Sequence, residues 1–412
     1  MTFIADFHIH SRYSRATSKN MDIPNLDRAA QMKGINLLGT GDFTHPLWCA
    51  HLKKTLIPAH PGIFKYGRTH FILTCEVNNI FYKEGKVRKI HNIIFAPDFD
   101  IVEKINGKLE RFGDLYSDGR PILKLEAKHL VELVMQIDAR VFVVPSHIWT
   151  PWFSLFGSNS GFDSIEECFE DCSRYILAGE TGLSSDPSMN WRLSSLDKIA
   201  LISCSDAHSP EKIGREANIF NVEMGYRAIL EAIKQKDPQK ILYTIEFFPQ
   251  EGKYHYDGHR NCDISLSPEE TKKYNGICPV CKKAVTVGVL NRVEQLADRP
   301  EGFKPENAIP FKRIVPLREI VAEAIQKKPA SKLVGETYTR IVNHYDGEMN
   351  VLLEVSLKDM HGFIPERVVE GIKRMREGKV KIKCGFDGVY GKVKIFDEEE
   401  EGEGKAEQLS LF

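Results

Sequence analysis

The chain has 412 residues, of which 42% are hydrophobic and 27% are charged, and its formal net charge is −1. This composition excludes a fibrous or disordered protein and predicts a folded chain of roughly two or three domains. The sequence contains no secretion signal and no apolar run long enough to span a membrane, so we expect a cytoplasmic protein that does not contact a membrane. Its nine cysteines therefore indicate reduced thiols or metal ligands rather than a disulfide framework.

The first part of the chain, residues 1–248, alternates between two hydrophobic patterns. Segments typical of buried strands are residues 3–10, 35–43, 70–77, 91–97, 139–147, 175–181 and 199–208. Segments with helical periodicity lie between or after them, at residues 25–34, 127–138 and 226–236. This alternation is typical of repeated β-α units, and it predicts an α/β fold with a parallel sheet or barrel.

Almost every predicted strand ends in a histidine or an acidic residue. These side chains are His8, His10, Asp42 with nearby His45, Glu76, His91, His147, Glu180, Asp206 and His208. In a barrel of parallel strands the carboxyl ends form the active-site face, so we expect these side chains to lie together. Imidazole and carboxylate groups together suit divalent zinc, manganese or iron. The pattern therefore predicts a metal centre.

The order of these motifs resembles that of the PHP (polymerase and histidinol phosphatase) family over residues 1–245. The resemblance implies a distorted TIM-like barrel of β/α units that holds up to three divalent metals, such as zinc, manganese or magnesium. It carries over, as metal ligands, His8 and His10 of the opening H-x-H, the bridging acid Glu76, His91, His147, and Asp206 and His208 of the closing D-x-H. Glu76, His147, Glu180 and Asp206 are the candidate catalytic residues.

Two positions leave alternatives open. The family often has a histidine directly after the acid of its second strand, whereas here Phe43 follows Asp42. Either Asp42 or His45 completes the third metal site, and the sequence does not distinguish them. Glu180 is a base behind the ligands, a substrate contact or a helix-capping acid, and the three interpretations have equal weight.

A cluster of divalent metals favours one kind of chemistry. Metals a few ångströms apart polarise a phosphoryl oxygen, lower the pKa of a bound water and stabilise the leaving alkoxide. The barrel alone therefore predicts hydrolysis of a phosphoester.

A second cluster of metal-type ligands follows the barrel, in residues 249–300. Cys278 and Cys281 form a C-x-x-C knuckle, and His259 with Cys262 forms an H-x-x-C arm before it. Paired arms of this kind predict one structural zinc, because four protein ligands leave no open position for a substrate. His255 is the reserve ligand if His259 faces solvent.

Charge is distributed unevenly over the rest of the chain. Residues 301–394 contain 18 Lys and Arg against 13 Asp and Glu, whereas residues 395–412 contain one Lys against seven acids. We expect a basic, helical C-terminal lobe over residues 301–396, and a disordered acidic tail over residues 397–412. Lysines and tyrosines around the zinc ligands form a mixture suited to phosphate contact and base stacking.

The order of barrel, histidine-cysteine zinc lobe and basic helical lobe resembles the endonuclease Q family across nearly the whole chain. The segments "GTGDFTHPLW", "SHIWTPW", "GETGLSSDP", "SDAHSP" and "DGHRNC...CPVC" carry this resemblance. It implies a DNA-repair nuclease that cuts the phosphodiester 5′ of a deaminated base (uracil, hypoxanthine or xanthine) or of an abasic site. Such an enzyme extracts the damaged nucleotide into a pocket, and Trp149, Trp152 and Phe153 are candidates for lining the route.

Two other functions fit parts of the sequence. A small-molecule phosphatase would use the same barrel but has no evident need for the zinc lobe or the basic lobe. A non-catalytic, zinc-containing DNA-binding adaptor would keep the zinc lobe, but it would have no need for the ligand set of the barrel.

The last residues contain a short apolar motif after the acidic run. Gln408, Leu411 and Phe412 resemble the peptide that docks into the replication sliding clamp, in which a glutamine precedes an aliphatic anchor and aromatics. The match is partial, because the chain stops after one aromatic residue. The motif predicts the sliding clamp as a partner.

Overall fold

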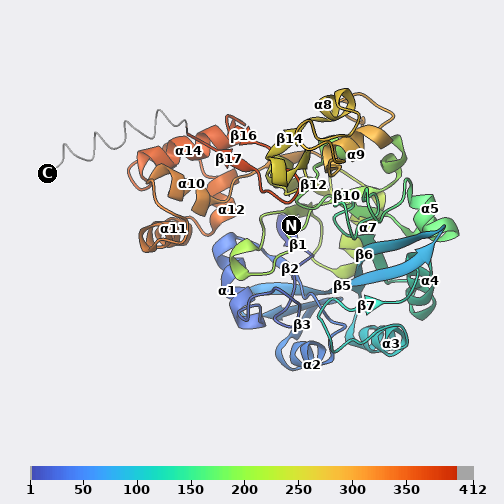
Figure 1. Cartoon of the computed structure of the whole chain (residues 1–412). Coiled ribbons are helices and arrows are strands. Elements are labelled where there is room, and N and C mark those ends of the chain that lie inside the picture. The colour runs from blue at the N-terminus through green and yellow to red at the C-terminus, as the bar shows by residue number, and fades with distance from the viewer. Residues whose placement is uncertain (1, 397–412) are drawn as a thin grey trace.

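The computed structural model describes residues 2–396, and Figure 1 shows the whole chain. The first part contains, in order, β1 (Thr2–Asp6), α1 (Ile23–Lys33), β2 (Leu37–Gly39), α2 (Pro46–Thr55), β3 (Ile57–His60), β4 (Ile63–Tyr66), β5 (Thr69–Lys83), β6 (Lys86–Ala96), α3 (Phe99–Leu109), β7 (Ile122–Leu123), α4 (Ala127–Ile137), β8 (Phe142–Pro145), α5 (Ile165–Phe169), η1 (Glu170–Tyr175), β9 (Ala178–Glu180), α6 (Pro187–Asn190), η2 (Ser194–Lys198), β10 (Ala200–Ile202), η3 (Pro210–Lys212), β11 (Ala217–Asn221), α7 (Tyr226–Gln235) and β12 (Ile241–Glu246). The middle part contains η4 (Pro249–Glu251), β13 (Asp257–His259), η5 (Arg260–Cys262), β14 (Ile264–Leu266), α8 (Pro268–Lys273) and α9 (Val289–Leu296). The last part contains β15 (Phe311–Arg313), α10 (Leu317–Ala324), α11 (Lys332–His344), α12 (Glu348–Leu353), α13 (Leu357–Met360), α14 (Glu366–Arg376), β16 (Lys381–Lys383) and β17 (Lys392–Lys394).

One large mixed sheet organises the first part of the chain. Its strands are hydrogen-bonded in the order β15-β12-β11-β1-β2-β5-β4-β3, with β6 and β7 also paired to β5, and β8 paired to β6. The pairs β1-β2, β2-β5, β5-β7 and β12-β15 are parallel, and the other pairs of this sheet are antiparallel. A separate parallel pair, β9-β10, forms a second sheet, and an isolated parallel bridge between Ile9 and Ala207 connects the segment after β10 to the segment after β1.

The mixed α/β class and the helical C-terminal region that the sequence predicts are confirmed. Every predicted strand segment contains a strand, and the three predicted helices correspond to α1, α4 and α7. Within residues 2–396 the ladder is mixed rather than purely parallel, and it does not continue from β8 into β9. The ladder is mixed in part because β5 and β6 form a long antiparallel hairpin, in which two neighbouring strands run in opposite directions.

Helix α1 illustrates how local sequence positions the strands. Asp22 accepts a hydrogen bond from the backbone N–H of Asn25, and Gly34 ends the helix with φ 78°. Ile23, Leu26 and Ala30 are buried, so the helix packs onto the sheet through one apolar face. The crossover through α1 lets β1 and β2 lie parallel, and this brings their carboxyl ends to one side of the molecule.

After β12 the chain forms two further groups of elements, the second lobe (residues 249–296) and the C-terminal lobe (residues 311–394), which contact the large sheet and each other. The chain leaves the sheet after β12, builds the lobe around β13, β14, α8 and α9, and returns as β15, which pairs with β12. The backbone of Gly385, between β16 and β17, donates to Gln250 O at 2.8 Å and accepts from Tyr256 N at 2.9 Å. The last hairpin therefore contacts the second lobe, while α10 to α14 form a helical group that packs beside α1 (Figure 1).

No helix between residues 2 and 396 is both long enough and apolar enough to cross a membrane.

Candidate active site and metal centre

His8 and His10 follow the carboxyl end of β1, which is an inner strand of the large sheet. Ile9, which lies between them, is buried and forms a parallel bridge with Ala207, and His10 N donates to Ala207 O at 3.0 Å. Because alternate side chains of an extended segment share a face, the two imidazoles point to the same side. Both rings are almost fully buried.

Glu76 lies at the centre of the site. It belongs to β5 and is 1% exposed. Its carboxylate oxygens lie 3.0 Å from His91 Nδ1, 3.2 Å from His147 Nε2, 3.5 Å from His10 Nε2 and 3.6 Å from His8 Nε2. Burial opposes ionisation, but the surrounding histidines outweigh it and hold the pKa of Glu76 well below its usual range. A carboxylate among four imidazoles is suited to bridging metal ions.

Three groups of potential ligand atoms meet here, each with its atoms within 4.8 Å of one another. The groups are His8, His10 and Glu76; His10, Asp206 and His208; and Glu76, His91 and His147. Glu76 and His10 each belong to two groups, so the three form one connected set. The set contains the seven residues that the PHP resemblance carried over as ligands.

The donor set fits divalent cations. Three imidazole nitrogens (Nε2 of His8, His10 and His91) and Oδ1 of Asp206 are buried and have no hydrogen-bond partner among the described residues. Buried polar atoms without a hydrogen bond are costly. The Nε2 atoms of His8 and His10 lie between 3.1 and 3.6 Å from carboxylate oxygens of Glu76 and Asp206, so shared cations would satisfy all four atoms. Burial also lowers the pKa of His91 to about 4, so its ring is neutral at physiological pH, as a metal ligand must be.

Two carboxylates lie behind these ligands rather than among them. Asp42 Oδ1 is 3.0 Å from His10 Nδ1, and Asp42 Oδ2 accepts hydrogen bonds from Ser11 N at 2.6 Å and Ser14 Oγ at 2.9 Å. Glu180 accepts from His8 Nδ1 at 2.9 Å and from the backbone N–H of His147 at 2.7 Å. Each acid therefore fixes the orientation of an imidazole, as carboxylates around metal centres commonly do.

The structure separates the two candidates for the third site. Asp42 uses its oxygens on His10 and the two serines, whereas His45 precedes α2 and stacks on Tyr13 with ring centroids 4.3 Å apart. Neither belongs to a candidate metal group within residues 2–396. The structure therefore brings neither of them into the ligand set, and Glu76 and His10 supply the shared ligands instead.

Arg120 is a site residue that the sequence analysis missed. Its Nη1 lies 3.2 Å from Glu76 Oε2, and its side chain is 24% exposed. Arg120 lies in the loop between α3 and β7, where hydrophobic periodicity gives no information about side-chain direction. The signal in the sequence is limited to the tight turn "SDGRP" directly before a short strand.

The aromatic residues proposed to line a nucleotide route divide into two kinds. Trp149 is fully buried and donates from Nε1 to Asn190, so it belongs to the core. The ring of Phe153 lies 5.0 Å from that of His91, and Phe153 has φ 63°. Trp152 is 38% exposed, and its ring lies edge-on to the ring of Tyr254 in the second lobe, with ring centroids 5.3 Å apart. Phe153 and Trp152 therefore extend from the metal ligands towards the second lobe.

The second ligand cluster is also assembled. His259, Cys262, Cys278 and Cys281 offer ligand atoms within 4.8 Å of one another. His259 ends β13, and its Nδ1 lies 3.7 Å from Cys281 Sγ. The apolar cluster of this lobe is small, with Leu266, Cys278 and Val285 as its buried members. His255, the reserve ligand, is buried outside this group, and burial lowers its pKa to about 4.

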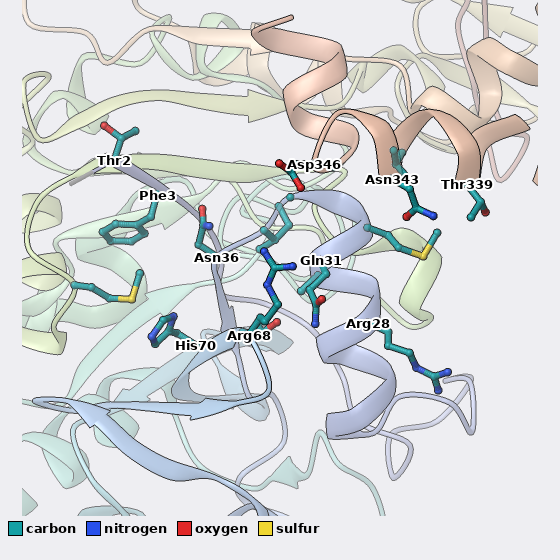
Figure 2. Close-up of a pocket in the computed structure, with 18 residues that line it drawn as sticks. Thr2, Phe3, Arg28, Gln31, Asn36, Arg68, His70, Thr339, Asn343 and Asp346 are labelled. Carbon is teal, nitrogen blue, oxygen red and sulfur yellow. The ribbon is translucent and has the colours of Figure 1, made fainter. Parts of the chain in front are cut away.

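A large hollow lies at the opposite ends of the same strands. Figure 2 shows this cavity of about 710 Å³, whose labelled lining residues include Thr2, Asn36, His70 and Asn343. Thr2 begins β1, and Asn36 and His70 lie at the starts of β2 and β5. The candidate ligands His8 and His10 follow the far end of β1, and Glu76 lies further along β5, so this cavity is separate from the candidate metal centre.

Gln408, Leu411 and Phe412, the predicted clamp-binding residues, and the predicted acidic tail lie outside the described residues.

Comparison with known proteins gives matches to the C-terminal region and to nearly the whole chain. The family described as MJ0043 C-terminal domain matches residues 316–379. The protein MJ0043 of Methanocaldococcus jannaschii is 34% identical over 257 residues, which is 60% of this chain but 31% of that protein. The chain thus spans about a third of the length of this relative.

Two solved structures resemble the chain from end to end. The lesion-specific endonuclease PfuEndoQ from Pyrococcus furiosus is 32% identical, with a TM-score of 0.87 over 97% of this chain and 96% of that one. A complex of endonuclease Q with a 27-mer duplex that has an abasic lesion at the active site is 32% identical, with a TM-score of 0.86 over 97% and 98% of the two chains. The likeness covers the large sheet, the cysteine-containing lobe and the helical lobe together, and this chain therefore belongs to the endonuclease Q family.

Proposed function

We propose that this protein is a metal-dependent DNA endonuclease that hydrolyses the phosphodiester at abasic sites and 5′ of deaminated bases such as uracil, hypoxanthine or xanthine. The observation that supports this proposal most directly is the connected ligand set around Glu76. It occurs in a chain that resembles, over nearly its whole length, a structure with an abasic duplex at its active site.

The reaction joins a water oxygen to phosphorus and breaks the bond from phosphorus to the leaving oxygen, which receives a proton. Bound divalent metals supply the Lewis acidity for this reaction, by polarising the phosphoryl oxygen and stabilising the leaving oxygen. The protein's own part is to hold the imidazoles in place, through Asp42 behind His10 and Glu180 behind His8. Asp206 and His208 are the ligands with the most exposed side chains, at 27% and 30%, so they face the substrate side.

The finer metal assignment follows from the donor types. Imidazole and carboxylate ligands suit zinc, manganese or iron, and a site with more carboxylate and water also accepts magnesium. We propose up to three such ions in the barrel, one for each candidate group, and one structural zinc held by His259, Cys262, Cys278 and Cys281.

The DNA-binding proposal is that the damaged nucleotide leaves the duplex and enters the space in front of the ligands. Deaminated and abasic positions are less strongly paired, so the cost of extrusion is lower there than at normal pairs. We propose that Phe153 and Trp152 contact the extruded nucleotide, because the ring of Phe153 lies beside His91 and Trp152 is exposed.

Two alternative functions make different demands on the chain. A small-molecule phosphatase would need the ligand set but has no evident use for the second and third lobes. A DNA-binding adaptor would need those lobes, but it would have no reason to keep buried, unpaired ligand atoms that destabilise the fold unless a cation is present.

One set of assays separates these functions. Labelled duplexes that contain uracil, hypoxanthine, an abasic site or no lesion are incubated with the protein, with manganese, with magnesium or with a chelator. We expect cleavage of the lesion-containing duplexes only, and none with the chelator.

Matched variants connect this activity to the metal centre. Glu76→Ala and His8→Ala should abolish cleavage while the protein still folds and binds DNA. Glu84→Gln, on the same hairpin but with 65% of the Glu84 side chain exposed, should cleave as the wild type does. Cleavage of a phosphate monoester but of no duplex would favour the phosphatase, and DNA binding without cleavage of any substrate would favour the adaptor.

A further inference from the structure

Arg120 reaches the metal centre from outside the ligand set. Its Nη1 contacts Glu76 Oε2 at 3.2 Å, on a carboxylate that already faces four imidazoles. Its other guanidinium nitrogens form no hydrogen bond or ion pair with any residue between 2 and 396, and the side chain is 24% exposed. Arg120 therefore keeps guanidinium donors without a protein partner on a side chain that solvent can reach.

The loop that carries Arg120 is held firmly. Asp118 Oδ1 accepts from Arg120 N at 3.1 Å and from Arg15 N at 3.2 Å, and Pro121 O accepts from Asn78 N at 3.0 Å, two residues from Glu76. A Cβ on Gly119 would lie 2.3 Å from Asp42 Oδ2, so only glycine allows this close approach. The position of Arg120 is thus fixed against the elements that position His10 and Glu76.

The charges of the site indicate what the free donors bind. When divalent cations occupy the groups around Glu76, a guanidinium beside that carboxylate is close to like charges, and in a partly buried site this repulsion is costly. An anion between the metals and Arg120 would offset this repulsion, because the anion attracts both the cations and the guanidinium. A phosphodiester oxygen has the charge and the acceptor geometry that a guanidinium matches best.

We propose that Arg120 binds a non-bridging oxygen of the scissile phosphate and stabilises the charge that develops on it as the water oxygen bonds to phosphorus and the leaving oxygen departs. This inference rests on the proposed function, because it assigns Arg120 to the same hydrolysis. Arg120 neither gives nor takes a proton, so the atom balance of the reaction is unchanged.

The first test compares cleavage of abasic duplex by the full-length wild type and by the variants Arg120→Ala and Arg120→Lys. Loss of one preorganised donor to a transition-state oxyanion typically lowers kcat about 10²–10³-fold, so we expect a fall of that size for Arg120→Ala. The kcat of Arg120→Lys should lie between those of the wild type and Arg120→Ala, and added guanidinium should partly restore the kcat of Arg120→Ala. Arg140→Ala, whose side chain pairs with Asp138 away from the site, is the control and should match the wild type.

The second test does not depend on DNA cleavage. Binding of inorganic phosphate to the metal-loaded protein is measured by calorimetry, together with metal content and Tm. We expect Arg120→Ala to keep its metals and its Tm but to bind phosphate about tenfold more weakly, in line with the loss of a charge-assisted hydrogen bond.

The outcomes distinguish this inference from the proposed function. If the wild type cleaves no lesion-containing duplex but Arg120→Ala binds phosphate more weakly, the proposed function is wrong and the phosphate contact stands. If cleavage and phosphate binding are unchanged in Arg120→Ala, or if that variant and Arg120→Lys both lose their metals, Arg120 does not bind the phosphate and the inference is overturned.

Discussion

Glu180 shows how one buried side chain sets the orientation of two candidate metal ligands at once. It bonds to His8 Nδ1 and to the backbone N–H of His147, and it is fully buried. The sequence left three roles open for Glu180, and these contacts favour the role of an acid behind the ligands. Removal of its charge should therefore act on metal affinity before it acts on the chemical step.

This interpretation predicts the behaviour of Glu180→Gln. Partners of this kind typically contribute about 10–100-fold in metal affinity, so the variant should need that much more metal for half-maximal cleavage and should recover near-normal kcat at excess metal. Metal titration followed by cleavage rate measures this. Glu170→Gln, at an exposed ion pair with Lys83, is the control. Cleavage that excess metal does not restore would instead indicate that Glu180 acts on the substrate.

Glu251 is a titrating group away from the metal ligands. Burial first, and then Glu319, raise the pKa of Glu251 to about 8, although Lys212 and Arg215 oppose the shift. Between its ordinary value of 4.5 and about 8, the folded protein keeps a proton that the unfolded chain releases. This group therefore makes the free energy of unfolding fall as pH rises through that window.

Glu251→Gln, which is neutral at every pH, should remove this contribution. Urea unfolding of the variant and of the wild type should give similar midpoints near pH 5, whereas at pH 9 the variant should be the more stable of the two. Glu211→Gln, at an exposed position, controls for the loss of a surface carboxylate. Parallel pH profiles for Glu251→Gln and the wild type would contradict the raised pKa.

At the scale of secondary-structure elements, the sequence predicts those features that depend on the local pattern of hydrophobic residues. The hydrophobic runs before His8, Glu76 and His147 predict strands whatever the order of the strands in the sheet. The polar side chains at the ends of these strands are therefore expected to lie close together, and the structure brings them together. Arg120 was missed because its loop has no period and its partner Glu76 is 44 residues away in the chain. Asp42 and His45 were inseparable because both follow β2, and only packing decides which one turns towards His10.

The cluster of His259, Cys262, Cys278 and Cys281 lies in a lobe that has only a small apolar core. Because metal binding there is also folding energy, Cys278→Ser and Cys281→Ser should each release one zinc per chain and weaken DNA binding. Metal analysis and DNA titration measure the two effects. Cys384→Ser, at the half-buried cysteine outside the cluster, should keep its zinc. Unchanged zinc in both cluster variants would show that the site was wrongly assigned.

The same lobe separates the two histidine candidates. The structure places His259 in the group and His255 outside it. His259→Asn should therefore lose zinc, and His255→Asn should keep it. The reverse result would restore His255 as the ligand.

At the scale of the whole molecule, a buried ion pair connects the first helix to the C-terminal lobe. Lys33 Nζ, on α1, lies 2.6 Å from Glu348 Oε2, which also accepts from Tyr338 OH at 2.6 Å, and Glu348 Oε1 accepts from Leu317 N at 3.0 Å. The side chains of Lys33 and Glu348 are 9% and 1% exposed. The sequence did not predict this contact, because it joins residues that are far apart in the chain and carry no motif.

Removal of one partner should be costly, because the other charge stays buried. Lys33→Met should lower the free energy of unfolding by about 3–5 kcal/mol, and the double variant Lys33→Met, Glu348→Gln should be less destabilised. Urea denaturation measures both. Lys332→Met, at a surface pair with 90% of the lysine side chain exposed, is the control and should change little. A Lys33→Met protein as stable as this control would show that the pair does not hold the lobe.

The return of the chain as β15 has a consequence for solubility. β15 is three residues long and forms the outer strand of the large sheet, with Lys312 exposed beside Arg313. Short, positively charged edge strands discourage sheets of different molecules from pairing. Since the lobe with the cysteine cluster forms the whole connection between β12 and β15, unfolding of that lobe would free the edge of β12. Removal of the proposed structural metal by a chelator should therefore promote self-association of the protein and also weaken its DNA binding.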